Sequence, residues 1–163
     1  MPGDFLPLLR ALREVHRVSG YPPRTEATDD GLLAWLTEQE PLARLVLEVD
    51  GVPCGHIRVI EPRPYLESFL LQQGGRTPVE VCLEIGQLFV APTAREQGAG
   101  QALTEHAVSL VREHGRHALV AAIGPESTRK IYQRAGFEVL GAFEGADGMN
   151  TVMICRNDPQ VSR

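Results

Sequence analysis

Two glycines at the start of an expected helix, Gly98 and Gly100, constrain this 163-residue chain more than any other feature. They follow an apolar run, Ile85–Val90, that is typical of a strand, and a short linker separates the run from the glycines. After Gly100, apolar residues recur at helical spacing as far as about Gly115. Glycines leave backbone N–H groups uncovered, and the helix dipole adds positive charge beside them. The pattern indicates either an anion site at a helix N-terminus or merely a flexible start to the helix.

Three phosphate-binding patterns compete for this segment. A P-loop requires Lys and then Ser or Thr in register, and neither follows Gly100. A dinucleotide fingerprint requires a third glycine where the chain has Leu103, and an acid at the end of the next strand, which is absent. The third pattern, R/Q-x-x-G-x-G/A after a V-x-P turn, fits at Arg95, Gly98 and Gly100, with the turn beginning at Val90.

A second motif lies downstream, where Tyr132 to Phe137 reads Y-x-x-x-G-F. Ser127 is expected to cap the helix that carries this motif, and Gly136 to close it in a left-handed conformation. With both motifs in order, the chain resembles the GCN5-related N-acetyltransferase (GNAT) superfamily over about Glu84–Phe143.

The resemblance implies an α/β fold in which a mixed, mostly antiparallel central sheet is flanked by helices on both faces. A single domain is expected over residues 1–163, which is an ordinary domain length. Family members usually begin with a strand, whereas this chain begins almost at a helix. The sequence leaves open whether the sheet lacks that edge strand or the start lies upstream of Met1.

Periodicity and turn residues predict the elements one by one. We expect a first helix capped by Asp4 and ending at Gly20, and an irregular, partly mobile stretch at 61–78. The other expected helices are Asp30–Thr37, one from Gly98 to Gly115, and Ser127–Ala135. The expected strands are Leu45–Val49, Cys54–Ile60 after an Asp50-Gly51 turn, a strand ending at Val90, Ala118–Ile123, Glu138–Phe143 and Asn150–Arg156.

The resemblance implies that the glycine loop holds the pyrophosphate of acetyl-CoA, here a co-substrate. It also implies that the central strand separates from its neighbour, so that the Leu88 N–H faces the thioester carbonyl. The residues expected to bind the coenzyme are Leu88, Phe89, Val90, Arg95, Glu96, Gln97, Gly98, Ala99, Gly100 and Gln101.

Acetyl transfer to an amine requires that the amine lose a proton and that the leaving thiolate gain one. Glu84 lies eleven residues before Arg95, the offset of the general base in histone-modifying members, and Glu80 is the second candidate. Tyr132 matches the family tyrosine whose hydroxyl points to the coenzyme sulfur. Otherwise Glu84 would be a charge at a solvated strand end and Tyr132 a core residue with a wet hydroxyl.

The acceptor would lie across the sheet, near segments 21–30 and 62–75. Their residues Tyr21, Asp29, Asp30, Glu61 and Tyr65 suit an ammonium group, and they also suit ordinary solvated loops. His56 borders this region and is kept outside the catalytic set. The acceptor is expected to be an amine of a small molecule or of a protein, acetylated in a ternary complex. The competing hypothesis is a silent acetyl-CoA-binding sensor or partner-binding module on the same fold.

Composition excludes several other classes. A net charge of −5 without a basic cluster argues against nucleic acid as a partner. No run approaches the ~20 apolar residues of a membrane span, and we expect a cytoplasmic monomer or homodimer. Cys54, Cys82 and Cys155 lack metal-ligand spacing, so we expect reduced thiols and no bound metal.

Overall fold

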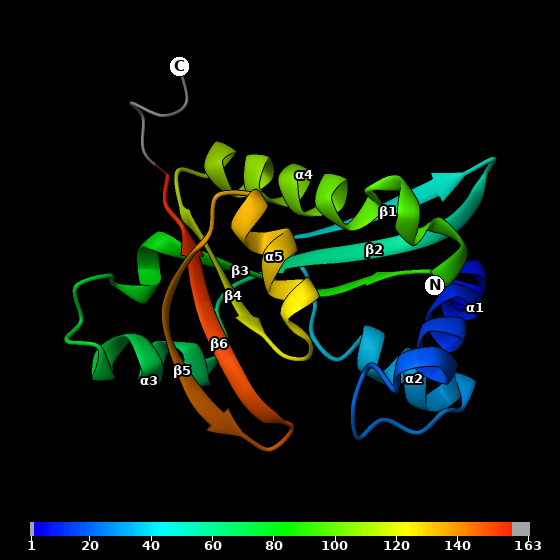
Figure 1. Ribbon diagram of the computed structural model, residues 1–163, viewed down its shortest axis with the longest axis horizontal. Helices are drawn as coiled ribbons and strands as arrows, with labels where there is room; N and C mark the ends of the chain where they lie inside the picture. Colours follow the sequence, from blue (N-terminus) through cyan, green and yellow to red (C-terminus); the bar gives the residue numbers. More distant parts are fainter. Residues whose placement is uncertain (1, 158–163) are drawn as a thin grey trace.

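The computed structural model describes residues 2–157, which form one six-stranded sheet with helices packed on it (Figure 1). The helices are α1 Pro2–Ser19, α2 Asp29–Leu36, α3 Pro64–Gln72, α4 Ala99–Glu113 and α5 Glu126–Arg134, with short 3₁₀ turns η1 Val79–Val81 and η2 Pro92–Gln97. The strands are β1 Ala43–Val49, β2 Val52–Ile60, β3 Cys82–Val90, β4 His117–Ala122, β5 Glu138–Gly145 and β6 Gly148–Cys155.

The strand order is β1-β2-β3-β4-β6-β5, and every neighbouring pair is antiparallel except β3 and β4. A parallel pair needs a crossover, which α4 supplies between β3 and β4. The predicted mixed, mostly antiparallel sheet is therefore confirmed. Within residues 2–157 no strand precedes α1, so β1 forms one edge of the sheet.

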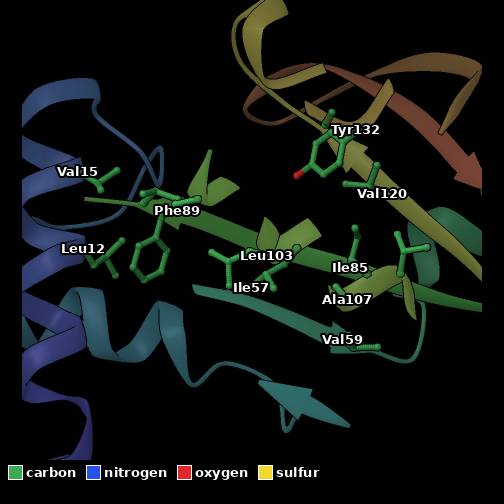
Figure 2. Packing of buried hydrophobic residues seen from close by; sticks show 14 of the residues in the cluster. Leu12, Val15, Ile57, Val59, Ile85, Phe89, Leu103, Ala107, Val120 and Tyr132 are labelled. Atoms are coloured by element: carbon green, nitrogen blue, oxygen red, sulfur yellow. The ribbon is translucent and has the colours of Figure 1, made fainter. Parts of the chain in front are cut away.

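Helices cover both faces of the sheet. Figure 1 shows α4 and α5 along one face, while α2 and α3 lie on the other side and α1 packs beside α2. Alternate residues of β2 and β3, among them Ile57, Val59 and Ile85, pack with Leu103 and Ala107 of α4 (Figure 2). The opposite face at β4 and β6 packs against Leu66, Phe69 and Leu70 of α3. Because side chains alternate along a strand, β3 presents Leu83 and Ile85 to α4 and turns Glu84 to the other face.

The first two helices start at residues other than those expected. The first helix already includes Pro2, so Asp4 lies inside its first turn and is not its N-cap. Proline suits this first helical position, since it lacks the N–H that would have no partner there. The second helix starts one residue earlier than expected, because the Thr28 hydroxyl accepts a 3.0 Å hydrogen bond from the Gly31 N–H.

The stretch 61–78, expected to be irregular, contains helix α3. Pro64 stands at the first helical position, and Leu66, Phe69 and Leu70 are buried at helical spacing. Both signals were present in the sequence, but Pro62 and Pro64 together with the glycines after the helix favoured an irregular stretch.

Of the two residues expected to bound the helix of the second motif, Gly136 is confirmed and Ser127 is not. Gly136 has φ +100° and follows α5, as expected of a glycine that closes a helix. Ser127 does not cap the helix: Pro125 occupies the N-cap position, and α5 begins at Glu126. The Asp50-Gly51 turn joins β1 and β2 with positive φ at both residues, the conformation of a two-residue hairpin turn.

Candidate active site

The central strands β3 and β4 part along their length. Their pairing covers only Cys82 to Glu84 of β3, and the last pair is Glu84 with Leu119. Beyond this point β3 continues to Val90 in register with β2 alone. The strands therefore open toward the N-terminus of α4, between the helices of one face and those of the other. This is the separation that the family resemblance implied for the segment containing Leu88 and Val90.

A bulge in β3 accompanies this opening. The register passes from Arg58 opposite Gly86 to His56 opposite Phe89, so β3 has one residue more than β2. Gln87 lies in the bulge with φ +51°, in the left-handed region that few residues other than glycine adopt. An extra residue in one strand redirects the side chains beyond it. As a result Phe89 points toward α1 and α2, where it stacks on His56 and packs on Trp35.

The helix α4 starts without a side-chain cap. Gly98 is its N-cap residue, in a left-handed conformation with φ +71°, and no heavy atom lies within 4 Å of the position of a Cβ there. The Ala102 N–H donates to the Gly98 carbonyl at 3.0 Å, so the N–H groups before Ala102 come before the hydrogen-bond ladder of the helix. Open space, uncovered N–H groups and the positive end of a 15-residue helix coincide at Gly98.

Other predicted loop residues have local contacts. The Arg95 Nε donates to the Val90 carbonyl at 3.0 Å, which ties η2 back to the end of β3. Gly100 allows close packing, because its Cβ position is 3.2 Å from the Ile131 Cδ1 of α5. Gln101 donates to Glu105 along α4. Ala99 is buried, while the side chains of Glu96 and Gln97 lie outside the described residues.

Tyr132 is buried between α5 and the sheet. Its side chain is 4% exposed, and its ring packs edge-on against Phe137. Burial raises its pKa, and proximity to Tyr21 raises it further. Figure 2 shows the hydroxyl pointing away from α5 toward the part of the core that contains Phe89. A neutral phenol placed there can donate a proton or a hydrogen bond toward the space between β3 and β4.

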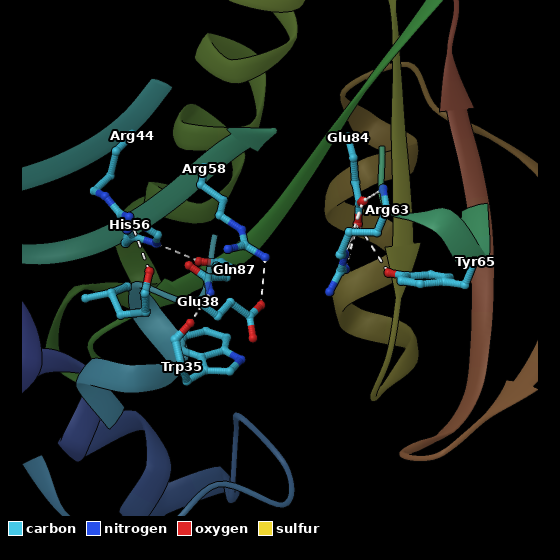
Figure 3. Close-up of polar contacts among 10 residues, drawn as sticks. Trp35, Glu38, Arg44, His56, Arg58, Arg63, Tyr65, Glu84 and Gln87 are labelled. Atoms are coloured by element: carbon cyan, nitrogen blue, oxygen red, sulfur yellow. Dashed lines mark hydrogen bonds and ion pairs between the residues drawn. The ribbon is translucent and has the colours of Figure 1, made fainter. Parts of the chain in front are cut away.

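Glu84 lies on the other face of β3 and is buried, not solvated. Its side chain is 1% exposed, and it forms a salt bridge with Arg63 at 2.6 Å. The Arg63 backbone N–H, at 3.0 Å, and the Tyr65 hydroxyl, at 3.2 Å, also donate to it (Figure 3). Burial opposes the charge on Arg63, but the hydrogen bond to Glu84 and the negative charge of Glu84 together raise the Arg63 pKa. Burial raises the Tyr65 pKa, and Glu84 adds to this rise.

A second charged group is buried on the same face, on strand β2. Arg58 is 1% exposed and donates from Nη2 to Glu38 at 2.9 Å. Its Nε and Nη1 are buried without a hydrogen-bond partner. Gln87 donates from Nε2 to the Trp35 carbonyl at 2.7 Å, and its Oε1 is likewise buried without a partner. Both side chains thus reach the same segment, residues 35–38 at the end of α2 (Figure 3).

His56 lies on the same face, and its two hydrogen-bond partners determine its protonation state. Its Nδ1 lies 2.8 Å from the Gln87 carbonyl, which only accepts, and its Nε2 lies 2.7 Å from the Arg44 Nη1, which only donates. The ring is therefore neutral with the proton on Nδ1. Burial lowers its pKa to about 3, and the nearby charges of Arg44 and Arg58 act in the same direction. His56 is a structural, neutral group at the rim of the site.

Gly86 leaves open space between the two buried charged clusters. It pairs with Arg58 across the strands, and Glu84 lies two residues before it on the same face. No heavy atom lies within 4 Å of the position of a Cβ at Gly86. Arg58 and Glu84 therefore flank Gly86 on this face, and each side chain is only 1% exposed.

Of the five residues expected around the acceptor, the structure brings only Tyr21 and Tyr65 into this region. Burial raises the Tyr21 pKa, while the charges of Arg58 and Arg63 lower it, and the Tyr21 ring packs edge-on against Trp35. Three others lie at the surface. Asp29 pairs with Arg13, Glu61 pairs with Arg116 at 2.8 Å, and Asp30 is exposed on α2.

A family model described as "Acetyltransferase (GNAT) family" matches residues 9–137, well over half of the chain. The chain belongs to the GNAT acetyltransferase family. No curated protein sequence matches it significantly.

Solved structures agree with the family assignment at the level of the fold. AAC(6')-Ib, an aminoglycoside acetyltransferase solved with ribostamycin and coenzyme A, is 19% identical, with a TM-score of 0.71 over 96% of this chain and 89% of that one. A ribosomal-protein-alanine N-acetyltransferase from Brucella melitensis is 20% identical, with a TM-score of 0.68 and 96% of each chain covered. YncA from Salmonella typhimurium, solved with its cofactor acetyl-CoA, is 18% identical, with a TM-score of 0.67 over 97% of this chain and 91% of that chain.

Sequence reasoning missed much of the polar face of this GNAT domain. Arg58, Gln87, Gly86 and the partner residues Glu38 and Arg63 were not singled out. An arginine within the apolar run of β2 was the available signal, since an isolated charge in a buried strand needs a partner or a ligand. Across residues 2–157 no cluster of three or more His, Cys, Asp or Glu is arranged to hold a metal ion. Nor does that part of the chain contain a helix long and apolar enough to cross a membrane.

Proposed function

We propose that this GNAT protein is an acetyl-CoA-dependent N-acetyltransferase that acetylates a primary amine in a ternary complex. The observation that carries the proposal is the parting of β3 and β4 beyond Glu84, which opens toward the uncapped start of α4. This opening has a proton-donor candidate on one face, Tyr132, and a buried carboxylate on the other, Glu84. Coenzyme and acceptor can then meet through the gap between the strands.

The start of α4 fits a pyrophosphate on physical grounds. Gly98 keeps the approach clear, and its left-handed backbone exposes successive N–H groups at the positive end of the helix. The segment Leu88–Val90, next to the gap, would lie along the pantetheine, with the Leu88 N–H facing the acyl carbonyl.

The proposed transfer needs two proton movements. The amine nitrogen bonds to the acyl carbon, the carbon–sulfur bond breaks, the amine loses a proton and the thiolate gains one. Tyr132 is proposed to supply the proton to the sulfur, because its buried hydroxyl stays neutral at any physiological pH. Glu84 is proposed to take the proton from the amine, directly or through a water molecule.

The contacts of Glu84 refine this role. Its carboxylate accepts hydrogen bonds from Arg63 and Tyr65, which hold it in place on this face of β3. Glu80, the second candidate, lies in η1 before the strand.

Release of free thiol from acetyl-CoA tests the proposal. A panel of amines should include amino acids, polyamines, an aminoglycoside and a peptide with a free N-terminus, and at least one should accelerate thiol release. Mass spectrometry of the product should show an added acetyl group. Tight acetyl-CoA binding with no turnover on any amine would instead favour the silent sensor or partner-binding module.

A further inference from the structure

We propose that the acceptor carries an anionic group beside its amine, as a free amino acid does, and that Arg58 binds this anion while the amine lies against Glu84. The inference rests on the proposed acetyltransferase function and narrows its acceptor to amines with a nearby carboxylate. The observations that carry it are the incomplete pairing of Arg58, the nature of its one partner, and the open space over Gly86.

Arg58 is a buried cation with unused hydrogen-bonding capacity. A guanidinium has five N–H donors, yet Nε and Nη1 of Arg58 have no partner although the side chain is only 1% exposed. Leaving buried donors unpaired destabilises a protein, so such a group is expected where a ligand completes it. The planar fork of a guanidinium matches the two oxygens of a carboxylate.

The one partner of Arg58 has the same chemistry as the proposed ligand. Glu38 follows the short helix α2, and its side chain is 42% exposed while that of Arg58 is fully buried. Because Glu38 already lies half in water, turning outward costs it little. We assign to Glu38 the part of an internal carboxylate that neutralises Arg58 until the carboxylate of an acceptor replaces it.

The open space over Gly86 lies where the amine and the carboxylate of such an acceptor would bind. Arg58 lies opposite Gly86, and Glu84 is the diagonal neighbour of Arg58 on the same face. Diagonal neighbours have Cα atoms about 7–8 Å apart, and their side chains can converge on one small molecule. The Gln87 Oε1, buried without a partner, adds a hydrogen-bond acceptor for an ammonium group.

The surrounding charges favour this class over polycationic amines. The guanidiniums of Arg44, Arg58 and Arg63 lie on this face with the carboxylates of Glu38 and Glu84, and the charge of Glu40 also acts on Arg44. The neighbouring His56 adds no charge because its pKa lies at about 3. The buried and incompletely paired guanidinium of Arg58 attracts a carboxylate and repels an amine that carries several further ammonium groups.

The test compares matched acceptors in the thiol-release assay. Free amino acids, the corresponding amino acid amides and kanamycin should be compared by kcat/KM with the wild-type protein. The amide keeps the amine and the side chain but removes the negative charge, so we expect at least about a 30-fold preference for the acid, in line with the loss of hydrogen bonds between charged groups. Kanamycin should be the poorest acceptor. Equal use of acid and amide would overturn the inference and leave the proposed function standing.

Two variants, one at Arg58 and one at Glu38, test the proposed contact with the acceptor carboxylate. Arg58→Gln should raise the KM for the acid about 10- to 100-fold while changing neither the KM for the amide nor the affinity for acetyl-CoA. Glu38→Gln should lower the KM for the acid, because it removes the competing carboxylate, with no such effect on the amide. If Glu38→Gln only lowers the melting temperature, the pair is structural and the inference fails.

A binding measurement tests the acceptor class separately from the proposed acetyltransferase function. Calorimetric titration of amino acids and their amides into the complex with coenzyme A reads the Arg58 contact without turnover. Preferential binding of the acid that is lost in Arg58→Gln supports the inference even if no acceptor is acetylated, in which case the proposed function fails alone. Absence of any preference in this titration overturns the inference independently of catalysis.

Discussion

Gly98 offers a test of the coenzyme site with an internal control at the other end of the same helix. Gly98 precedes α4 with φ +71°, and Gly115 follows it with φ +70°. Both glycines are exposed, and neither has a heavy atom within 4 Å of its Cβ position. Replacing either one with alanine therefore introduces the same backbone strain and no clash.

The expected loss of stability is the same for the two variants. A left-handed conformation costs an L-residue about 1–2 kcal/mol. For a domain of this size such a loss lowers the melting temperature by roughly 2–8 °C. Differential scanning fluorimetry without ligand should therefore show similar shifts for Gly98→Ala and Gly115→Ala.

The affinity for acetyl-CoA should separate the two variants. A Cβ at Gly98 occupies the space through which a phosphate would approach the N–H groups at the start of α4. Each hydrogen bond to a charged group contributes about 1.5–3 kcal/mol, so losing one weakens binding by roughly 10- to 150-fold. Calorimetric titration should show this loss in Gly98→Ala and unchanged affinity in Gly115→Ala. Equal affinities in the two variants would refute the pyrophosphate assignment.

Four further predictions address the gap between the strands and the face beyond it. Tyr132→Phe should bind acetyl-CoA normally and turn over about 10²-fold more slowly; an unchanged rate and pH profile would make the tyrosine a packing residue. Glu84→Gln should lose most activity at neutral pH and regain part of it at high pH, while the loss of the charge-assisted hydrogen bonds from Arg63 lowers stability by about 1.5–3 kcal/mol. Activity lost equally at every pH would assign Glu84 to positioning. Gly86→Leu should fold and bind acetyl-CoA but acetylate no acceptor, because its side chain fills the open space; normal turnover would move the acceptor site elsewhere. The pKa of His56 is about 3 in the folded protein and 6.5 in the unfolded chain, so protons bind the unfolded state preferentially. The free energy of unfolding should therefore fall by up to roughly 1.4 kcal/mol per pH unit as the pH drops from 6.5 toward 3. Urea titrations should show a shallower pH dependence in His56→Gln, and an identical slope would contradict the buried neutral ring.

The sequence by itself determined the features that depend on neighbouring residues. The order of most elements, the Asp50-Gly51 turn and the glycine that ends α5 follow from periodicity and from the conformations that glycine allows. The glycine loop could be found for the same reason, since a strand, a linker and a glycine-rich helix start are contiguous along the chain. Even here a local signal could mislead, because Ser127 suggested a helix cap while the chain uses Pro125.

Only the tertiary structure decided which polar groups meet. Arg58 and Glu38 are 20 residues apart, and Arg63 and Glu84 are 21 apart, so no local pattern pairs them. The sequence predicted Glu84 as a general base, with a charge at a solvated strand end as the alternative, but only packing of α3 and the preceding loop buries it beneath Arg63.

The face to which a side chain points is likewise a tertiary decision. The bulge at Gln87 inserts one residue into β3, and this reverses the alternation that would have been read from the sequence beyond it. The open space over Gly86 likewise depends on how the strands and helices pack around β3. A sequence can place a carboxylate on a strand, but the strands and helices that pack around it decide whether it faces water, a partner or a substrate.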